Sequence, residues 1–272
     1  MLTKATGAPG GTVPVLKAAG TRITGWWHGL NPVDRAFLWQ HAGTELQSAG
    51  VLGPATQPKF DIGSGKHGAW TALMEKSLPK PGAQLLAQVA SAIPRAVNRT
   101  FADIGDLLNS HWAADNLRHY DGNSGQTKPI DVEHLLANDA GLRQKVDDLL
   151  ADHGPSWKRE AIEAFRDSGG QPVLLEKKIS RWHGHTADSW DDWFAIGSYQ
   201  YTLSGLVKAV PDADGNPKVS VDYQVHVADR YNWNNFGSSP TVDFFHGIPH
   251  RYGLSQEYDM RGTSKLRSHP LD

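Results

Sequence analysis

The chain contains no cysteine among its 272 residues. Disulfide bonds, thiol nucleophiles and cysteine-ligated metal ions are therefore excluded. A chain without thiols suits a protein that passes from a reducing compartment into an oxidising one, because it has no redox liability on the way. We therefore expect a protein that works outside the cell that makes it.

Long apolar segments are also lacking. No run approaches the roughly 20 apolar residues that a membrane-spanning helix requires, and residues 1–20 lack the apolar core of a secretory signal. We expect a soluble protein that is secreted or delivered to the periplasm of a target bacterium. Its exit would then depend on lysis, on a dedicated secretion machine or on a longer polypeptide that carries it.

Neither sign of charge is in excess. The 27 Lys and Arg residues nearly balance the 29 Asp and Glu residues, and the net charge is -2. No broad attraction to nucleic acid or to anionic membranes is indicated, so an anionic ligand would have to be bound locally. The ten tryptophans are many for a chain that is 39% hydrophobic. They are interpreted either as anchors of the core or as contacts to sugars or lipid headgroups.

The first part of the chain has helical periodicity. Residues 1–24 are rich in Gly, Ala and Thr and are typical of a flexible lead-in. Residues 25–169 form a predicted helical domain, in which Asn31 caps a helix that starts at Pro32. A later helix begins near Asp139 or Ala140, and Gly154-Pro155 is expected to end it.

Beyond Gly169-Gly170 the period of the apolar residues shifts from about 3.6 to 2. Residues 170–272 therefore form a predicted antiparallel, half-barrel-like sheet domain with one buried face. Two strands are expected, one up to Val210 and one from Val219, with a hairpin turn at PDADGNP. The segments VLLEKKISRW before them and QEYDMRG after them are expected to join the sheet as further strands. The fold class is α+β, with helices first and the sheet last.

The regular alternation of the second strand ends at Asp229. By the parity of that strand, Asp229 and Tyr231 lie on the face that carries Val225 and Val227. An ionised carboxylate on a buried face is costly unless a cation, an arginine or backbone N–H groups meet it. Asp229 therefore either caps the turn after the strand or belongs to a reactive site.

The residues that follow favour a reactive or phosphate-handling site. A histidine titrates near neutral pH, and the guanidinium fork of an arginine pairs with phosphate. Such groups gather within about one loop after Asp229, namely Tyr231, Asn232, Asp243, His246, His250 and Arg251.

This part of the chain resembles the C-terminal toxic domain of colicin M-type bacteriocins. The similar tracts are AIGSYQYTLSG, DRYNWN and HRYGLSQEYDMRG, and the resemblance covers roughly residues 180–265. That family is recognised by an Asp-x-Tyr-Asp motif at a strand end, followed by a His-Arg pair, in an antiparallel sheet domain. The resemblance implies a phosphodiesterase-type hydrolase that cleaves lipid II, the undecaprenyl-linked peptidoglycan precursor. It also implies a divalent cation, such as magnesium, and action in the periplasm of a target cell.

Carried over by position, Asp229 and Tyr231 match the first Asp and the Tyr of the motif, and His250-Arg251 matches the His-Arg pair. The resemblance implies that Asp229 holds the cation and that Tyr231 orients the substrate or a water molecule. It implies His250 as general base or acid and Arg251 as the partner of a phosphate. The expected substrate contacts are Asn232, Trp233, Asp243 and His246.

Two departures from the family pattern stand out. Asn232 replaces the second Asp of the motif, which removes a charge that would help to hold a cation. The distance along the chain from Asp229 to His250 is also longer than in the family, as though SSPTVDFFHGIP were an insertion. Asp243, within that segment, is the candidate for replacing the missing carboxylate.

The implied partners are lipid II and a cognate immunity protein, and no nucleic acid is expected. The alternative is a non-enzymatic one, a structural, adhesive or pore-associated module of a secreted or phage assembly. A second cluster, SRWHGHTADSWDDW, contains Arg181 and the pair His183 and His185. This pair is either a zinc site, completed by Asp188, Asp191 or Asp192, or part of a polar loop before the sheet.

Overall fold

The structure is a computed structural model that describes residues 23–60, 63–107, 109–233 and 240–271. Side chains at positions 190 and 240–243 are not described, and the predicted lead-in lies almost wholly outside the described residues. The helices are α2 (Pro32–Ser48), α3 (Ala69–Met74), α4 (Lys80–Leu107), α5 (His111–Asp121), α6 (Val132–Asn138), α7 (Ala140–Asp167), α8 (Trp190–Ala195) and α9 (Pro240–Arg251). The strands are β1 (Lys128–Pro129), β2 (Val173–Lys178), β3 (His183–Thr186), β4 (Ser198–Pro211), β5 (Pro217–Tyr231), β6 (Tyr258–Thr263) and β7 (Arg267–Pro270).

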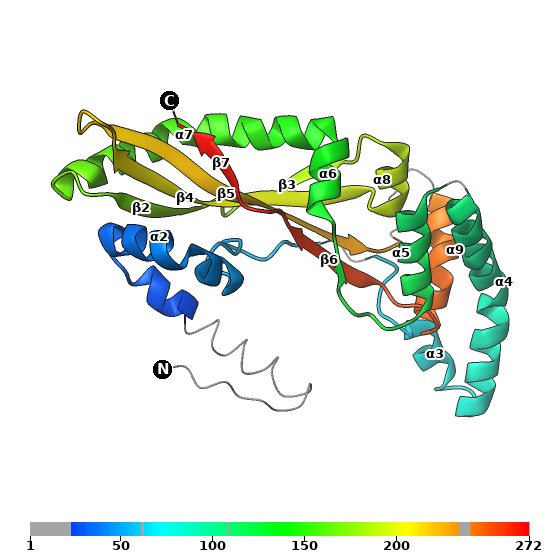
Figure 1. The fold of residues 1–272 in the computed structure, drawn as a ribbon. Helices are drawn as coiled ribbons and strands as arrows, with labels where there is room; N and C mark the ends of the chain where they lie inside the picture. The colour runs from blue at the N-terminus through cyan, green and yellow to red at the C-terminus, as the bar shows by residue number, and fades with distance from the viewer. Residues whose placement is uncertain (1–22, 61–62, 108, 234–239, 272) are drawn as a thin grey trace, which may run out of the picture.

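The predicted α+β class is confirmed, with most helices before most strands (Figure 1). The sheet has the order β1-β6-β5-β4-β2, while β3 also pairs with β4 and β7 with β5. The prediction of a purely antiparallel sheet is wrong in one detail, because the short β1 runs parallel to β6. The backbones approach closely there, since a Cβ on Gly262 would lie 2.2 Å from the Ile130 carbonyl oxygen.

The predicted hairpin is the centre of the sheet. β4 and β5 are antiparallel, with Leu203 opposite Val225. The Asp212 side chain shapes the turn by accepting hydrogen bonds from the backbone N–H groups of Asp214 (2.9 Å) and Asn216 (2.8 Å). Gly215 has a φ of 83°, which a residue with a Cβ adopts only with strain. Turn chemistry and alternating apolar residues therefore agree on the same register.

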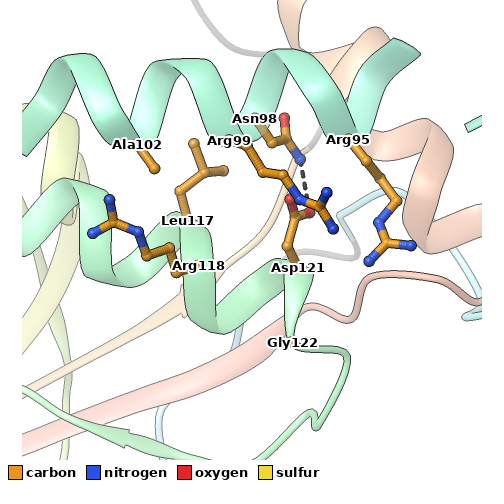
Figure 2. A pocket seen from close by; sticks show the side chains of 8 residues that line it. All are labelled: Arg95, Asn98, Arg99, Ala102, Leu117, Arg118, Asp121 and Gly122. Carbon is orange, nitrogen blue, oxygen red and sulfur yellow. Dashed lines mark hydrogen bonds between the residues drawn. The ribbon is translucent and has the colours of Figure 1, made fainter. Parts of the chain in front are cut away.

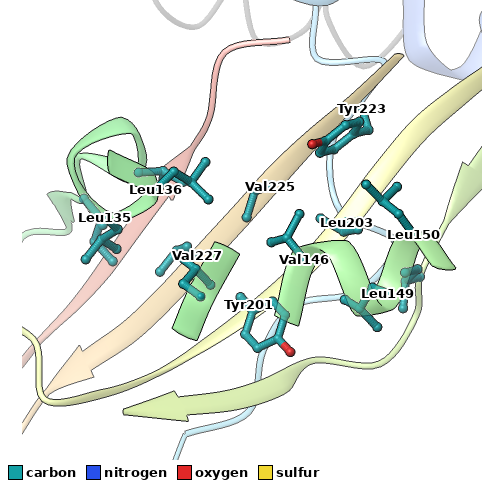
Figure 3. Packing of buried hydrophobic residues seen from close by; sticks show 14 of the residues in the cluster. Leu135, Leu136, Val146, Leu149, Leu150, Tyr201, Leu203, Tyr223, Val225 and Val227 are labelled. Carbon is teal, nitrogen blue, oxygen red and sulfur yellow. The ribbon is translucent and has the colours of Figure 1, made fainter. Parts of the chain in front are cut away.

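Helix α7 covers one face of this hairpin (Figure 3). Val146, Leu149 and Leu150 of α7 lie in one buried cluster with the odd-numbered residues of β4 and β5. These strand residues include Tyr201, Leu203, Tyr223, Val225 and Val227. The face identified from the sequence is thus the one that forms the main core.

The other face of the sheet is also buried, contrary to the prediction of a single buried face. Leu174 and Leu206 form a second cluster with Trp27 and Leu52, which come from the segment around α2. His226 is 2% exposed on this face, and Ser204 donates a hydrogen bond to the Leu52 carbonyl. Polar residues were expected to face solvent here, but Leu52 of the N-terminal segment supplies the acceptor for Ser204, and the carbonyl groups of Ile179 and Ser264 accept hydrogen bonds from Thr202 and Gln224.

The main core crosses the boundary predicted at Gly169-Gly170. It extends from Ala102 to Leu271, so the helical and sheet parts share one buried cluster. The expected helix end at Gly154-Pro155 is also wrong, because α7 continues to Asp167 with Pro155 inside it. A Cβ on Gly154 would lie 3.2 Å from Leu271 Cδ2. The glycine serves close packing against the C-terminal residues, and this packing overrides the local stop signal.

A group of helices lies at the far end of the sheet, next to β6 (Figure 1). α4 packs against α3, α5 and α9 there, and α3 also contacts α9. The C-terminal end of β5 and the start of β6 meet these helices, which places the predicted site residues at the junction of sheet and helices. Among the described helices, none has the length and apolarity needed to cross a membrane.

Candidate functional site

Asp229 lies near the end of β5, opposite Met260 of β6. Burial raises the pKa of its carboxyl group to about 7, a hydrogen bond with the Arg230 backbone partly opposes this rise, and the charge of Asp259 adds to it. The hydrogen bond is to the adjacent residue, within the strand. The carboxyl group therefore exchanges a proton near neutral pH, as a proton-transfer group at this position would require, whereas a cation ligand needs the deprotonated form.

Tyr231 belongs to an aromatic cluster that closes the end of the main core. Its ring stacks on Tyr258, with centroids 5.1 Å apart and planes at 17°. The rings of Tyr120 and Trp233 lie 5.9 and 5.8 Å away. Burial raises the pKa of Tyr231, so its hydroxyl stays protonated and can donate a hydrogen bond.

His246 lies on α9 and stacks on Trp233, with ring centroids 4.4 Å apart. Its Nδ1 is hydrogen-bonded to Asn98 Oδ1 of α4, and its carbonyl oxygen accepts a hydrogen bond from the Tyr120 hydroxyl at 2.8 Å. Burial lowers the pKa of His246, which is 4% exposed. The two predicted substrate contacts Trp233 and His246 therefore pack against each other.

His250 is brought to the same junction but has partners at both ring nitrogens. Nε2 donates to the Gly65 carbonyl oxygen at 2.8 Å, and Nδ1 accepts from the Glu257 backbone N–H at 3.2 Å. These partners fix the tautomer with a proton on Nε2. Burial lowers the pKa of His250, which favours the neutral imidazole that a general base requires.

Arg251 is 8% exposed and is held by backbone carbonyl groups and aromatic rings. Its Nε donates to the Ser64 carbonyl oxygen (3.1 Å), and another guanidinium nitrogen donates to that of Phe244 (3.2 Å). The guanidinium carbon lies 5.0 Å from the ring centroids of both Trp70 and Phe244. In this arrangement Arg251 joins α9 to the segment before α3.

The sequence analysis did not identify Glu257, which is 3% exposed at the centre of the junction. Its Oε1 accepts hydrogen bonds from the Ser64 backbone and hydroxyl groups and, at 3.4 Å, from the Trp233 backbone N–H. Its Oε2 has no hydrogen-bond partner among the described residues and lies 3.8 Å from a guanidinium nitrogen of Arg230. The available signal was an acidic residue at the start of the last predicted strand, three positions before Met260.

The two remaining predicted substrate contacts are Asn232 and Asp243. Asn232 is partly exposed, and its Cβ would lie 2.4 Å from a Cβ on Gly63, so it packs closely on that loop. Asp243 is in the first part of α9, and its side chain lies outside the described residues. The proposal that Asp243 supplies a carboxylate to the site stays a prediction.

Asp229 is the carboxylate that the resemblance assigns to a divalent cation, and it belongs to no cluster of three ligand-type residues among the described side chains. Among the described side chains, the one group of three ligand-type residues within 4.8 Å of one another is Asp139, His185 and Asp188, which does not include Asp229. Magnesium commonly takes one or two carboxylates from the protein and its other ligands from phosphate and water. A single carboxylate that is not saturated with donors is compatible with that mode.

The pair His183 and His185 is divided between two environments. The His183 ring lies 5.6 Å from that of Tyr201, while His185 Nε2 bonds to both oxygens of Asp139, at 2.9 and 3.0 Å. Asp139 also caps α7 by accepting from Leu142 N. The predicted acidic partners also have hydrogen bonds of their own. Asp188 accepts one from Gly141 N, and Asp191 accepts one from the Ser110 hydroxyl. Asp192 accepts one from the Ser189 hydroxyl and is also hydrogen-bonded to His134. Each of these acidic side chains therefore already accepts a hydrogen bond within the protein, and the zinc site stays a prediction.

Comparison of the chain with protein-family models finds no match, and comparisons with curated proteins and with solved structures find no significant match.

Proposed function

We propose that this protein is an antibacterial toxin of the colicin M type that hydrolyses the phosphate linkage of lipid II and so blocks cell-wall synthesis. The observation that carries the proposal is the position of Asp229 and Tyr231 at the end of β5, where His250 and Arg251 of α9 meet the same junction. These are the motif residues on which the resemblance depends. They come from two consecutive elements, β5 and α9, and are linked through Glu257, which accepts from the Trp233 backbone N–H and whose own N–H donates to His250.

In the proposed reaction, a magnesium ion held by Asp229 and by substrate oxygens would supply charge stabilisation at the phosphate. Tyr231, which remains protonated, would donate a hydrogen bond to the substrate. Water would attack phosphorus as the P–O bond to the leaving group breaks. His250 would donate its Nε2 proton to the leaving oxygen once its hydrogen bond to Gly65 opens and would regain a proton from the attacking water, while Arg251 would pair with the phosphate after leaving its aromatic neighbours. The aromatic cluster around Trp233 would exclude water from one side of the substrate. We propose action in the target periplasm and a cognate immunity protein as partner.

A second candidate is the non-enzymatic module, and one observation favours it. His250 and Arg251 are both buried, and their polar atoms are hydrogen-bonded to backbone groups. Residues held in this way stabilise the packing of α9 without any substrate. Under this alternative the same contacts would be purely structural, and Asp229 would be a costly but inert strand-end residue.

Incubation of the purified protein with labelled lipid II, with and without a chelator, separates the two candidates. We expect release of a phosphorylated headgroup with magnesium and none with the chelator. The Asp229→Asn variant should lose about 100-fold or more of the rate, as expected when a charge-stabilising group is removed. Asp259→Asn is the matched control, because Asp259 is the next carboxylate along the sheet and pairs with Arg230 and Arg261.

Absence of headgroup release from the wild type with magnesium would overturn the proposal. An Asp229→Asn variant that cleaves at the wild-type rate would remove Asp229 from the mechanism. Expression in the periplasm gives an independent measure, since the toxin should lyse cells there and be tolerated in the cytoplasm.

A further inference from the structure

Helix α4 exposes its large apolar side chains to solvent. Val89 is 65% exposed and Ile93 is 69% exposed. We call the exposed apolar residues of α4 the apolar stripe, which comprises Leu85, Leu86, Val89, Ile93, Phe101, Ile104 and Leu107. The side of α4 that is buried carries small or polar residues, namely Ala83, Ala87, Ser91, Pro94, Asn98 and Ala102. In a surface helix that only serves a core, the large apolar residues face inward, so α4 has the reverse arrangement.

Positive charge accompanies the apolar stripe. From Lys80 to Ala102 the helix carries Lys80, Arg95 and Arg99 and no acidic residue. Neither arginine forms an ion pair with a described residue, and Arg95 Nε is buried without a hydrogen-bond partner. Arg118 of α5 differs, because it pairs with Asp103 and Asp106. The apolar stripe up to Phe101 thus has only basic charged neighbours on α4, whereas Asp103 and Asp106 flank its last residues and pair with Arg118.

Both unpaired arginines line a pocket of about 210 Å³ between α4 and α5 (Figure 2). Asn98 and Asp121 form part of its wall, and the Asp121 carboxylate accepts hydrogen bonds from Asn98 (2.9 Å) and Ser255 (2.8 Å). Both hydrogen bonds are to the same oxygen, Oδ1, and neither Arg95 nor Arg99 forms an ion pair with Asp121, so their guanidinium groups can meet an anion from outside. A phosphate group has the charge and the acceptor oxygens that two such forks bind.

We infer that α4 docks on the surface of an anionic phospholipid bilayer, with the apolar stripe in the headgroup and acyl boundary and with Arg95 and Arg99 on headgroup phosphates. A helix with one strongly apolar side and neighbouring basic residues, but too polar overall to cross a membrane, lies in the plane of the interface. Each basic residue near an anionic surface adds attraction that salt screens. The inference does not depend on lipid II cleavage, although a lipid-linked substrate would be met at the same surface.

Co-sedimentation with vesicles tests the inference without lipid II. The wild type should bind vesicles that contain phosphatidylglycerol, bind vesicles of phosphatidylcholine alone much more weakly, and be released by added salt. Val89→Glu with Ile93→Glu should lower the partition coefficient tenfold or more, about the effect of removing one or two buried aliphatic side chains from the boundary. Each of Arg95→Gln and Arg99→Gln should lower it roughly fivefold and reduce its salt dependence.

The matched control is Phe37→Glu on α2, because Phe37 is 60% exposed and lies away from α4. This variant should bind as the wild type does. Each substitution introduces a polar side chain at an exposed or partly exposed position, so the variants should fold. Circular dichroism should confirm that they do.

Equal partition of wild type and the Val89→Glu, Ile93→Glu variant would overturn the inference. So would binding that does not distinguish phosphatidylglycerol from phosphatidylcholine. Light scattering gives a third outcome. If the wild type is a dimer, the same double substitution makes it a monomer, and neither kind of vesicle is bound, then the apolar stripe binds a second copy of the chain instead. Loss of lipid II cleavage with intact vesicle binding would overturn the proposed function alone.

Discussion

Two carboxylates approach the same face of the sheet, Asp139 at the start of α7 and Asp229 at the end of β5, and their surroundings differ. Asp139 is completely buried and accepts hydrogen bonds from Leu142 N (2.8 Å), the Tyr199 hydroxyl (3.0 Å) and His185. Its burial by itself raises the pKa, but these donors outweigh burial and lower it below 3.8. Asp229 has only the Arg230 backbone against its burial, and its pKa rises to about 7.

The comparison shows how burial and donor number decide the role of a carboxylate. With several donors, the charged form is the stable one, and Asp139 acts as a helix cap that also holds β3 and β4. With a single donor, neither protonation state is strongly preferred at neutral pH. Such a group destabilises the fold when charged, which is the condition in which a cation or a substrate would bind it. Asp139 is thus a structural cap, whereas Asp229 lacks the donors that hold such a cap in its charged form.

Replacing Asp139 is expected to have the largest effect on stability. Asp139→Ala should lower the free energy of unfolding by about 3 kcal/mol or more, because it leaves three buried donors unpaired. Urea unfolding followed by circular dichroism measures this. The loss should be present above the ordinary pKa of 3.8 and vanish as the pH falls well below it, since the lowered pKa makes the stabilising charge disappear there.

Asp188→Ala is the matched control for Asp139→Ala. Asp188 belongs to the same group but is exposed, and it accepts one backbone hydrogen bond, from Gly141 N at 2.7 Å. We expect a loss of about 1 kcal/mol or less. Equal losses for the two variants would show that the donors around Asp139 contribute no more than a surface cap.

Replacing Asp229 is expected to raise the free energy of unfolding at high pH, whereas replacing Asp139 lowers it. Because the folded pKa is raised to about 7 from 3.8, the folded state binds the proton more tightly, and this stabilisation is lost as the pH rises from about 4 through 7. Asp229→Asn removes that loss and should raise the free energy of unfolding by about 1–3 kcal/mol at pH 8 in the presence of a chelator. Wild type and variant should have equal stability near pH 4. A variant that is less stable at pH 8 would show that Asp229 is a satisfied turn cap.

The sequence predicted the hairpin and the position of Asp229 because both depend on local signals. Alternating residues such as Leu203 and Val225 and the Asp-Gly turn fix the register within about 30 residues of chain. Strand parity then places Asp229 on the core face. The prediction of one exposed face failed because the cover of that face comes from Leu52, far away in the sequence. The helix end at Pro155 failed for the same reason, since Leu271 packs on Gly154.

Glu257 shows why the composition of the site could not be predicted completely. Its donors are Ser64, which is 193 residues away, and Trp233, which follows β5. Nothing local in the sequence indicates that a glutamate at the start of β6 is buried. Likewise, His250 was expected to act as general base or acid, but Gly65 and Glu257 occupy its two ring nitrogens. Contacts between distant segments decide which polar residues are available, and a single sequence does not reveal them.

The smallest expected effect isolates one donor of Asp139. Tyr199→Phe removes one of the three hydrogen bonds and should lower the free energy of unfolding by about 1 kcal/mol. Tyr201→Phe, two positions along the same strand face, removes a hydroxyl that has no hydrogen bond among the described residues and should change stability by less than about 0.5 kcal/mol. Because Tyr199 helps to lower the pKa of Asp139, Tyr199→Phe should also move the acid unfolding transition to higher pH, and Tyr201→Phe should leave it in place. An acid transition that stays put in Tyr199→Phe would mean that Leu142 and His185 alone hold Asp139 in its charged form. The difference in pKa between Asp139 and Asp229 would then come from two effective hydrogen-bond donors at Asp139 and one at Asp229.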